Sequence, residues 1–534
     1  INELIRLKNN MAIYDRTLES EGGYVDNPND PGGATNFGIS SRYLKQKYGR
    51  DVSPQEIQNL TREDAVKIYE EDFYKKPGID KLPPSIQENV FDMGVNAGQN
   101  RAIRLLQKGL GVPEDGVIGQ STIDAAKKAI EEGTYDASKY SDARKKYYEE
   151  LVAADSNREE FRKRQDHLIE LLSEKKLDGI LLFRQESMFY LTGYDTFGYV
   201  FFQCLYLGID GKLILLTRSP DLRQAQQTSI VEDIRIWVDG ESVNPALELK
   251  EILRESGVKG KSIGVEYDSY GLTAKNGKML DSVLDGFCNL TDASDLVNRL
   301  RVVKSQEELV YVRKAAVLAD DALDEAHSMV REGCDEGELL AAMQGAVFRG
   351  GGDYPGNEFI IGSGENALLC RYYSGRRKLS PEDQITLEWA GVYRHYHAAM
   401  MRTIPVGRVT EQHQRMFDVC LESMEACQKA LSPGNAIGEV FDAYASTCDS
   451  SGMRDHRLNA TGYSLGTTFS PNWMDWPMFY HGNTVIAEKN MVFFLHMILM
   501  DSDSGNAMCF GHTVLVTDSG CECLSRHPFE LVVR

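Results

Sequence analysis

Glu388 is the residue whose type and setting best fit acid–base or nucleophilic chemistry. It lies in the otherwise apolar segment ITLEWAG, which we expect to form a strand. A carboxylate in such a setting can act as a nucleophile or as the base that activates a water molecule. The alternative is structural, a buried ion pair with Arg402 or Arg371. We predict Glu388 to be a catalytic residue.

Imidazole and aromatic side chains occur in the segments that we expect to surround this acid. His397 and Arg402 follow it closely in the chain, although strand alternation alone does not tell which of them share its face. His496 interrupts VFFLHMILM and His512 precedes TVLVT, and each is either a pocket residue or a satisfied structural histidine. Trp473 in PNWMDWPMFY either lines an amphipathic pocket or packs beneath a loop. We predict that all five contribute to substrate binding.

A second acidic motif lies near the start of the chain. The segment ESEGGYVDNPNDPGGATNFGIS places Glu21 at an expected helix end, Asp30 in a glycine-rich turn and Thr35 just after it. Glycosidases need a protonated carboxylic acid at the leaving oxygen and a second group that handles water or the sugar cation. The alternative is a simple turn. We predict Glu21, Asp30 and Thr35 to be catalytic residues of a sugar-cleaving site.

The elements that must position these residues change in character near residue 153. None of the ten histidines and ten cysteines lies in the first 150 residues. This part has a helical pattern, and Thr61 with Asp64 and Ser121 with Asp124 resemble capping boxes at helix starts. We therefore expect a small, mostly α domain over residues 1–152.

Short apolar, β-branched runs alternate with helical segments beyond that boundary. This pattern predicts a parallel-type α/β domain over 153–298, followed by a second domain over 299–534 that mixes helices and strands. The strands expected in the two domains are 179–183, 212–216 and 262–266, then 385–393, 491–499 and 512–517, with long helices at 306–331 and 410–431.

Charge and hydropathy exclude several classes of partner. The formal net charge is -21 and there is no basic patch, so we expect no nucleic-acid partner. The longest apolar run, 491–500, is far shorter than the roughly 20 residues that span a bilayer, so we expect no membrane partner. The cysteines lie between Cys204 and Cys523 without a CxxC pair, which is typical of a reducing cytoplasm.

The N-terminal motif, taken as a whole, resembles that of glycoside hydrolase family 108, a family of lysozyme-like peptidoglycan hydrolases. The resemblance covers roughly residues 10–150 and implies that Glu21, in EGGY, is the catalytic acid. The segment VFDMGVNAGQNRAIRLLQKGLGVPEDGVIGQST resembles the peptidoglycan-binding part that follows in that family. For residues 1–152 it therefore implies peptidoglycan as the partner.

From about residue 156 the chain resembles the creatinase/aminopeptidase P family, whose C-terminal half has the pita-bread fold. The matching segments are LVNRLRVVKSQEELVYVRKAA, ITLEWAGVYRHYHAAMMRT, GYSLGTTFS, NMVFFLHM and CFGHTVLVTDSG. The resemblance implies a multidomain protein in which the lysozyme-like domain is followed by a creatinase-type α/β domain and an α+β pita-bread catalytic domain. It also implies a homodimer.

The metal ligands of the peptidases in that family are largely exchanged here. By resemblance, Glu388 stands at the first aspartate, Ala399 at the second, Tyr463 at the ligand histidine, and His496 and His512 at the two glutamates. A two-metal site needs hard oxygen ligands, so we expect no metal pair and predict neither metal nor cofactor. The alternative is a single transition metal on Glu388, His496 and His512.

Metal-free members of the family, the creatinase and ectoine hydrolase-like branches, cleave C–N bonds in small zwitterions. Arg371 stands where creatinase has its catalytic histidine, and its forked guanidinium suits a substrate carboxylate. We add Tyr463 and Arg371 to the substrate-binding residues and predict metal-independent hydrolysis of a non-peptide C–N bond in an anionic or zwitterionic metabolite. The alternatives are a catalytically silent binding module and an Xaa-Pro-type peptidase with an altered metal site. Together with the first domain, the chain is then bifunctional or artificially joined.

Overall fold

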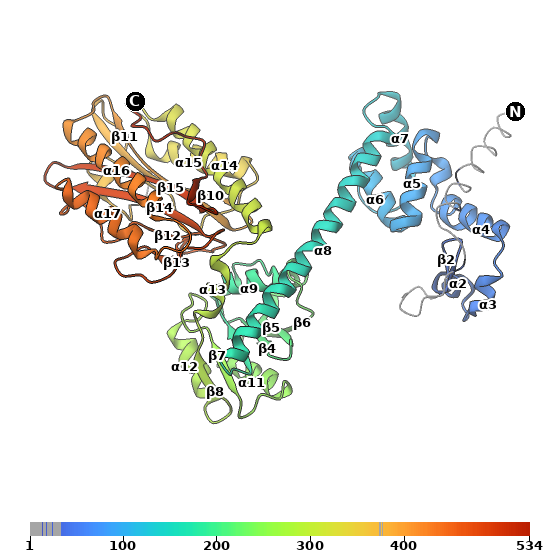
Figure 1. Ribbon diagram of the computed structural model, residues 1–534. Coiled ribbons are helices and arrows are strands. Elements are labelled where there is room, and N and C mark those ends of the chain that lie inside the picture. The colour runs from blue at the N-terminus through green and yellow to red at the C-terminus, as the bar shows by residue number, and fades with distance from the viewer. Residues whose placement is uncertain (1–12, 14–17, 19–23, 25–33, 373–374, 376) are drawn as a thin grey trace. The chain divides into compact units, whose positions relative to one another are not determined.

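The computed structural model describes residues 13, 18, 24, 34–372, 375 and 377–534 (Figure 1). By its internal contacts the chain divides into two compact units, residues 1–157 and 158–534. The predicted catalytic residues Glu21 and Asp30 lie outside the described residues. None of the helices in the described part of the chain has an apolar stretch long enough to span a membrane.

The first unit is mostly helical, as the sequence pattern predicts. A two-stranded ribbon precedes the helices, and Thr35 begins its first strand. The elements are β1 (Thr35–Asn36), β2 (Ile39–Ser40), α2 (Ser41–Tyr48), α3 (Pro54–Gln58), α4 (Arg62–Ile68), η1 (Tyr69–Lys75), η2 (Ile79–Lys81), α5 (Pro84–Ala97), α6 (Gln99–Leu110) and α7 (Gln120–Glu131).

One of the two predicted helix starts in this unit is confirmed and the other is wrong. Thr61 caps α4, with its hydroxyl accepting from the backbone N–H of Asp64 (3.2 Å) and the Asp64 carboxylate accepting from the backbone N–H of Thr61 (3.2 Å). α7, in contrast, starts at Gln120 after Gly119 and has no side-chain cap. Ser121 therefore lies inside the first turn, where its hydroxyl cannot close the helix start.

α8 (Ala137–Glu174) continues without a break through the boundary that the sequence indicates near residue 153. After it comes a six-stranded sheet in the order β6-β5-β4-β3-β7-β8. Its strands are β3 (Gly179–Leu182), β4 (Cys204–Gly208), β5 (Leu213–Arg218), β6 (Asp233–Trp237), β7 (Ser262–Val265) and β8 (Asn289–Asp292). The helices and turns around it are α9 (Gln185–Thr192), η3 (Gly198–Val200), η4 (Ser219–Asp221), α10 (Leu222–Thr228), α11 (Pro245–Glu255), α12 (Ala274–Leu284) and α13 (Leu296–Val302).

This sheet is mixed, which corrects the expected parallel sheet. β3 and β5 both run antiparallel to β4, whereas β3, β7 and β8 run parallel to one another and β5 runs parallel to β6. The reason is the short connection at 209–212 between β4 and β5, which is a hairpin and permits only antiparallel pairing.

The C-terminal part is built on an antiparallel eight-stranded sheet in the order β13-β12-β14-β15-β11-β10-β9, with β16 also paired to β15. Its strands are β9 (Ile360–Ser363), β10 (Asp383–Tyr393), β11 (Tyr396–Val406), β12 (Gly462–Ser464), β13 (Asp475–Met478), β14 (Val492–Asp501), β15 (Asn506–Val516) and β16 (Cys521–Cys523). The helices are α14 (Gln306–Met329), α15 (Glu336–Arg349), η5 (Gly364–Leu368), α16 (Glu411–Ala430) and α17 (Gly438–Ser450). The long helices and strands expected here are confirmed.

Strand register decides which side chains of this sheet share a face. Glu388 pairs with Met401, Met401 with Gly511, and Gly511 with His496, so these four positions cross the central strands at one level. Side chains alternate along each strand, so the neighbour Trp389 points to the other face, where its indole N–H donates to the Ala319 carbonyl of α14 (2.9 Å). We call these the Glu388 face and the helix face.

Candidate functional site

Glu388 lies in the middle of β10 and only 7% of it is exposed. The Tyr463 hydroxyl donates a hydrogen bond to its carboxylate. Burial raises the pKa of Glu388 to about 7, while the charge of Arg371 and the bond from Tyr463 hold it down. A carboxyl group with this pKa exchanges its proton readily at neutral pH.

Tyr463 is itself held by a second hydrogen bond. Tyr463 lies opposite Phe494 of β14 in the sheet, and its hydroxyl accepts a hydrogen bond from the indole N–H of Trp473 (2.9 Å). Burial and the charge of Glu388 raise the pKa of the Tyr463 hydroxyl well above its ordinary value, so it remains a donor to the acid. Trp473, Tyr463 and Glu388 thus form a chain of directed hydrogen bonds.

His496 reaches the same face from β14. Its ring packs against those of Tyr463 and Phe494, at centroid distances of 5.8 and 5.3 Å. Burial lowers the pKa of His496 to about 4, so the imidazole is neutral at physiological pH. Its Nδ1 is buried and has no hydrogen-bond partner within the described part of the chain. This nitrogen is therefore free to bond a substrate or water.

Arg371, which follows η5, contributes the positive charge. Its side chain is exposed, donates to the Cys370 carbonyl (3.2 Å), and its charge lowers the pKa values of both Glu388 and His496. It lines a cavity of about 380 Å³, here called the Arg371 pocket. Ile360, the cross-strand neighbour of Glu388, lines the same pocket, which places the acid beside it.

The residues around Glu388 do not fit a pair of metal ions. Its neighbours across the strands, Met401 and Gly511, offer no oxygen ligand, and neither does Ala399 further along β11. No group of three or more His, Cys, Asp or Glu side chains in the described ranges could hold a metal ion. One carboxylate and one imidazole lack the negative charge that a two-metal site requires.

His397 is close to the site but is fully occupied. Its Nε2 accepts from the backbone N–H of Gly356 (2.8 Å), so its Nδ1 carries the proton and donates to the His395 carbonyl (2.8 Å). Burial lowers the pKa of His397 to about 3. With both nitrogens bonded, the ring holds the loop at Gly356 in place and leaves no atom for a substrate.

Arg402 and His512 are not brought together with Glu388. They lie on the helix face, where Arg402 Nη2 donates to His512 Nε2 (2.7 Å) and the guanidinium stacks over Phe510 at 4.3 Å. The cause is the register of β15, which places Gly511 rather than His512 opposite His496. The expected role of these two residues in substrate binding is corrected accordingly.

Trp473 is 1% exposed and acts on the site through Tyr463 rather than as a lining residue. Glu186 and Arg301, in contrast, line a second cavity, of about 490 Å³, that the sequence analysis did not predict. Glu186 lies in the first turn of α9, shortly after the carboxyl end of a predicted strand, and ligands of α/β sheets commonly bind at such ends. The position of Glu186 after a predicted strand is the sequence feature that could have indicated its place in a binding site.

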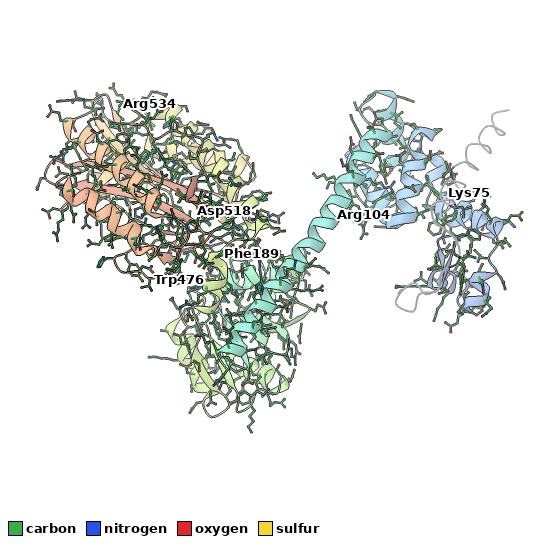
Figure 2. The ribbon with its side chains drawn as sticks, in the orientation of Figure 1. Lys75, Arg104, Phe189, Trp476, Asp518 and Arg534 are labelled. Atoms are coloured by element: carbon green, nitrogen blue, oxygen red, sulfur yellow. The ribbon has the colours of Figure 1, made fainter. Side chains whose placement is uncertain are left out.

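The α/β domain and the C-terminal domain meet at this second cavity. Phe189 of α9 packs edge-on against Phe469 at 5.7 Å, and the Tyr199 hydroxyl donates to the Ser470 carbonyl (2.7 Å). Phe189 and Trp476, a residue of β13 that lines the cavity, are labelled in Figure 2. The α/β domain therefore contacts the segment that leads from Tyr463 to Trp473.

Four family matches cover most of the chain. Residues 14–98 match glycosyl hydrolase 108 and 101–163 match a predicted peptidoglycan domain. Residues 164–303 match the creatinase/prolidase N-terminal domain, and 310–518 match metallopeptidase family M24. The chain is therefore a hydrolase that joins a lysozyme-like module to an M24-type pita-bread fold.

Individual relatives match the larger unit. The ectoine hydrolase of Halomonas elongata is 27% identical over 382 residues, which are 68% of this chain and 94% of that protein. The Xaa-Pro dipeptidase of Pyrococcus furiosus is 21% identical over 372 residues, 70% of this chain and 100% of that protein. The crystal structure of a dipeptidase from Pyrococcus horikoshii OT3 shares the fold, with a TM-score of 0.62 and 24% identity over 70% of this chain and 100% of that one.

Proposed function

We propose that residues 158–534, which carry the pita-bread fold, hydrolyse a non-peptide C–N bond in a small anionic or zwitterionic metabolite without a metal pair. The observation that carries the proposal is the buried Glu388 carboxyl, with a pKa of about 7, hydrogen-bonded by Tyr463 beside the Arg371 pocket. The neighbours of Glu388 across the strands, Met401 and Gly511, offer no oxygen ligand for a metal ion.

In this mechanism the substrate carboxylate pairs with the forked guanidinium of Arg371. Ionised Glu388 takes a proton from a water molecule, and the water oxygen attacks the carbon of the C–N bond. As that bond breaks, protonated Glu388 returns the proton to the leaving nitrogen. The neutral His496 accepts a hydrogen bond at Nδ1 from the substrate or the water, and Tyr463 keeps the acid oriented.

Ectoine is the first substrate to test, since one relative is named for its hydrolysis and the compound is a cyclic amidine that carries a carboxylate. A guanidino acid is the second. Turnover is measured by proton NMR with wild type and Glu388→Gln, and binding by calorimetry. We expect turnover to fall roughly 100- to 10,000-fold in the variant while binding persists. Unchanged turnover in Glu388→Gln would exclude the proposed base.

Metal independence has its own experiment. Purified protein is analysed for Mn, Co and Zn, and ectoine turnover is measured before and after dialysis against a chelator. We expect turnover to survive the chelator. Two equivalents of bound metal, with turnover that disappears and returns on adding the ion, would favour an Xaa-Pro-type peptidase site instead.

For residues 1–152 we propose muramidase activity on peptidoglycan, supported by the matches to glycosyl hydrolase 108 and the predicted peptidoglycan domain. Glu21→Gln is expected to abolish clearing of a peptidoglycan suspension, because an amide cannot donate the proton that the leaving oxygen needs. Unchanged clearing would rule out Glu21 as that acid. We also propose a cytoplasmic homodimer, which sedimentation and cell fractionation test directly.

A further inference from the structure

A second cavity adjoins the Arg371 pocket. This Glu186 pocket, of about 490 Å³, lies between the α/β domain and the pita-bread domain. The two pockets share three lining residues, Tyr270, Asn472 and Met474. A ligand seated beside Arg371 can therefore extend into the Glu186 pocket.

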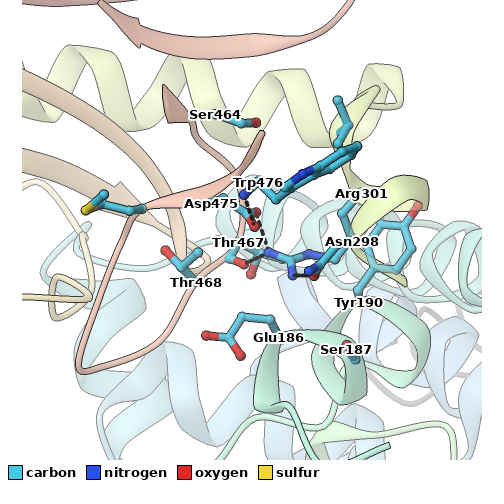
Figure 3. Close-up of polar contacts among 12 residues, drawn as sticks. Glu186, Ser187, Tyr190, Asn298, Arg301, Ser464, Thr467, Thr468, Asp475 and Trp476 are labelled. Atoms are coloured by element: carbon cyan, nitrogen blue, oxygen red, sulfur yellow. Dashed lines mark hydrogen bonds and ion pairs between the residues drawn. The ribbon is translucent and has the colours of Figure 1, made fainter. Parts of the chain in front are cut away.

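Both arginines of the Glu186 pocket already have carboxylate partners. Arg301 is 3% exposed, and its Nη2 donates to the Asp475 carboxylate and to the Thr467 carbonyl, each at 2.6 Å (Figure 3). Arg184 pairs with Asp268 (3.3 Å). The charge of each guanidinium is therefore already balanced by a carboxylate, although Arg301 Nε has no hydrogen-bond partner in the described part of the chain.

Glu186 is the acid that remains. Its Oε1 accepts from the backbone N–H of Phe469 (3.1 Å), but it forms no ion pair with any cation in the described ranges. Figure 3 shows its carboxylate turned away from the Arg301 guanidinium, with no interaction drawn between them. Burial raises the pKa of Glu186 although the charge of Arg301 lowers it. A partly buried carboxylate without a cation is costly, and a cationic ligand would offset that cost.

The other walls of the pocket also suit a cation. Tyr267 and Tyr270 line it, and the faces of aromatic rings attract cationic nitrogen groups, as Arg299 over the Trp476 ring (5.2 Å) already illustrates at the edge of the pocket. We infer that the Glu186 pocket binds the cationic nitrogen group of the substrate, an amidinium or an ammonium, so that the substrate carries a carboxylate at Arg371 and this cation at Glu186. This inference rests on the proposed function for the Arg371 end and narrows the substrate class from anions and zwitterions to zwitterions.

The test compares ligands that differ only in the ammonium group. The probes are the ω-amino acids from γ-aminobutyrate to ε-aminocaproate, each paired with the fatty acid of the same length, and binding to the full chain is measured by calorimetry. We expect at least one amino acid to bind roughly 10- to 100-fold more tightly than its fatty acid, as a charged hydrogen bond predicts.

Glu186→Gln is the informative variant, because its amide oxygen still accepts from the Phe469 N–H while the charge is gone. It is expected to reduce the preference for the amino acid to within about twofold and to leave fatty-acid binding unchanged. Glu248→Gln, the same change at an exposed position on α11, is the matched control and is expected to keep the preference. Equal binding of both probe types by wild type, no binding of any amino acid, or a preference that survives Glu186→Gln would overturn the inference.

The outcome is separable from that of the proposed function. If Glu388→Gln retains turnover while the Glu186-dependent preference is present, the base is wrong and the ammonium pocket stands. If Glu388-dependent turnover is present but wild type binds both probe types equally, the ammonium pocket is wrong and the proposed hydrolase stands.

Discussion

The two faces of the eight-stranded sheet both bury ionisable side chains, but these side chains differ in how many of their hydrogen-bonding atoms have partners. On the helix face, Arg402 Nη1 donates to the carbonyls of Met401 (2.8 Å) and Gly511 (3.0 Å), and its Nη2 donates to His512 Nε2. On the Glu388 face, the acid has Tyr463 as its hydrogen-bond donor, and Nδ1 of His496 has no partner in the described part of the chain.

The difference shows that burial of a charged group is a poor guide to function in this fold. Burial lowers the pKa of Arg402 to about 10 and raises that of Glu388 to about 7, so both residues are perturbed. What separates them is the remaining capacity for hydrogen bonds, which Arg402 and His512 have used up and which Glu388 and His496 have kept. Substitutions of side chains whose hydrogen bonds are used up should therefore change stability, and substitutions of Glu388 or His496 should change chemistry.

The largest expected effect belongs to Trp389→Ala on the helix face. This fully buried indole packs against α14 and donates to the Ala319 carbonyl, so its loss leaves a cavity and an unpaired acceptor. We expect the free energy of unfolding to fall by about 3 to 5 kcal/mol, measured by scanning calorimetry. The turnover number of the folded fraction should be unchanged, and a large fall in it would break the comparison.

Glu388→Gln should change the pH dependence of stability. The carboxyl has an ordinary pKa of 4.5 and a folded-state pKa of about 7, so the folded state binds more protons in between. The stabilising contribution of the protonated acid is present below pH 4.5 and is lost as the pH rises through 7. Between these limits the stability of wild type should fall by roughly 3 kcal/mol relative to the variant.

That experiment compares denaturation of the two proteins across the same pH series, so that all other titrating groups cancel. A constant difference between wild type and Glu388→Gln would mean that the acid titrates as it does in water. The proton transfer proposed for it would then lose its basis.

Tyr463→Phe tests the comparison through the turnover number and its pH dependence. It removes the donor that holds the pKa of Glu388 down, so the acidic limb of the pH–rate profile should move to higher pH. We expect the turnover number to fall roughly tenfold to a hundredfold, the loss typical of one hydrogen bond to a charged group. A shift of the limb to lower pH would contradict the assigned direction of the bond.

The smallest expected effect is a difference in the free energy of unfolding between two histidine variants. His397→Phe leaves the Gly356 N–H without its acceptor and should lower the free energy of unfolding by about 1.5 kcal/mol. His496→Phe removes a ring whose Nδ1 has no partner among the described residues, so stability should change by less than about 0.5 kcal/mol while turnover falls. Equal destabilisation by the two changes would remove the distinction between an occupied and an available imidazole.

Local sequence patterns predicted the long elements well. The helix expected at 306–331 is α14 (Gln306–Met329), and the strand at 385–393 lies within β10 (Asp383–Tyr393). Strand direction in the first sheet was not predictable in this way, because alternation of apolar residues reports burial and not which neighbour a strand pairs with.

The buried position of Glu388 could be predicted from the sequence, but the faces of its neighbours could not. Glu388 stood out because a carboxylate on an apolar strand is costly, and that argument needs no partner strand. The faces of His496 and His512 depend on the register between β14 and β15, and one residue of register exchanges them. Glu186 and Asp475, which are far apart in the sequence, meet in one cavity only through packing of the two domains.

The hydrogen-bond chain from Trp473 through Tyr463 gives the enzyme a built-in optical probe. All four tryptophans, at 237, 389, 473 and 476, lie beyond residue 157, so indole emission reports on the larger unit alone. Trp473 is separated from the carboxyl by a single phenol. Ionisation of the acid, or arrival of a ligand beside it, will alter the field at that indole and should be visible in unlabelled protein as a shift of its emission.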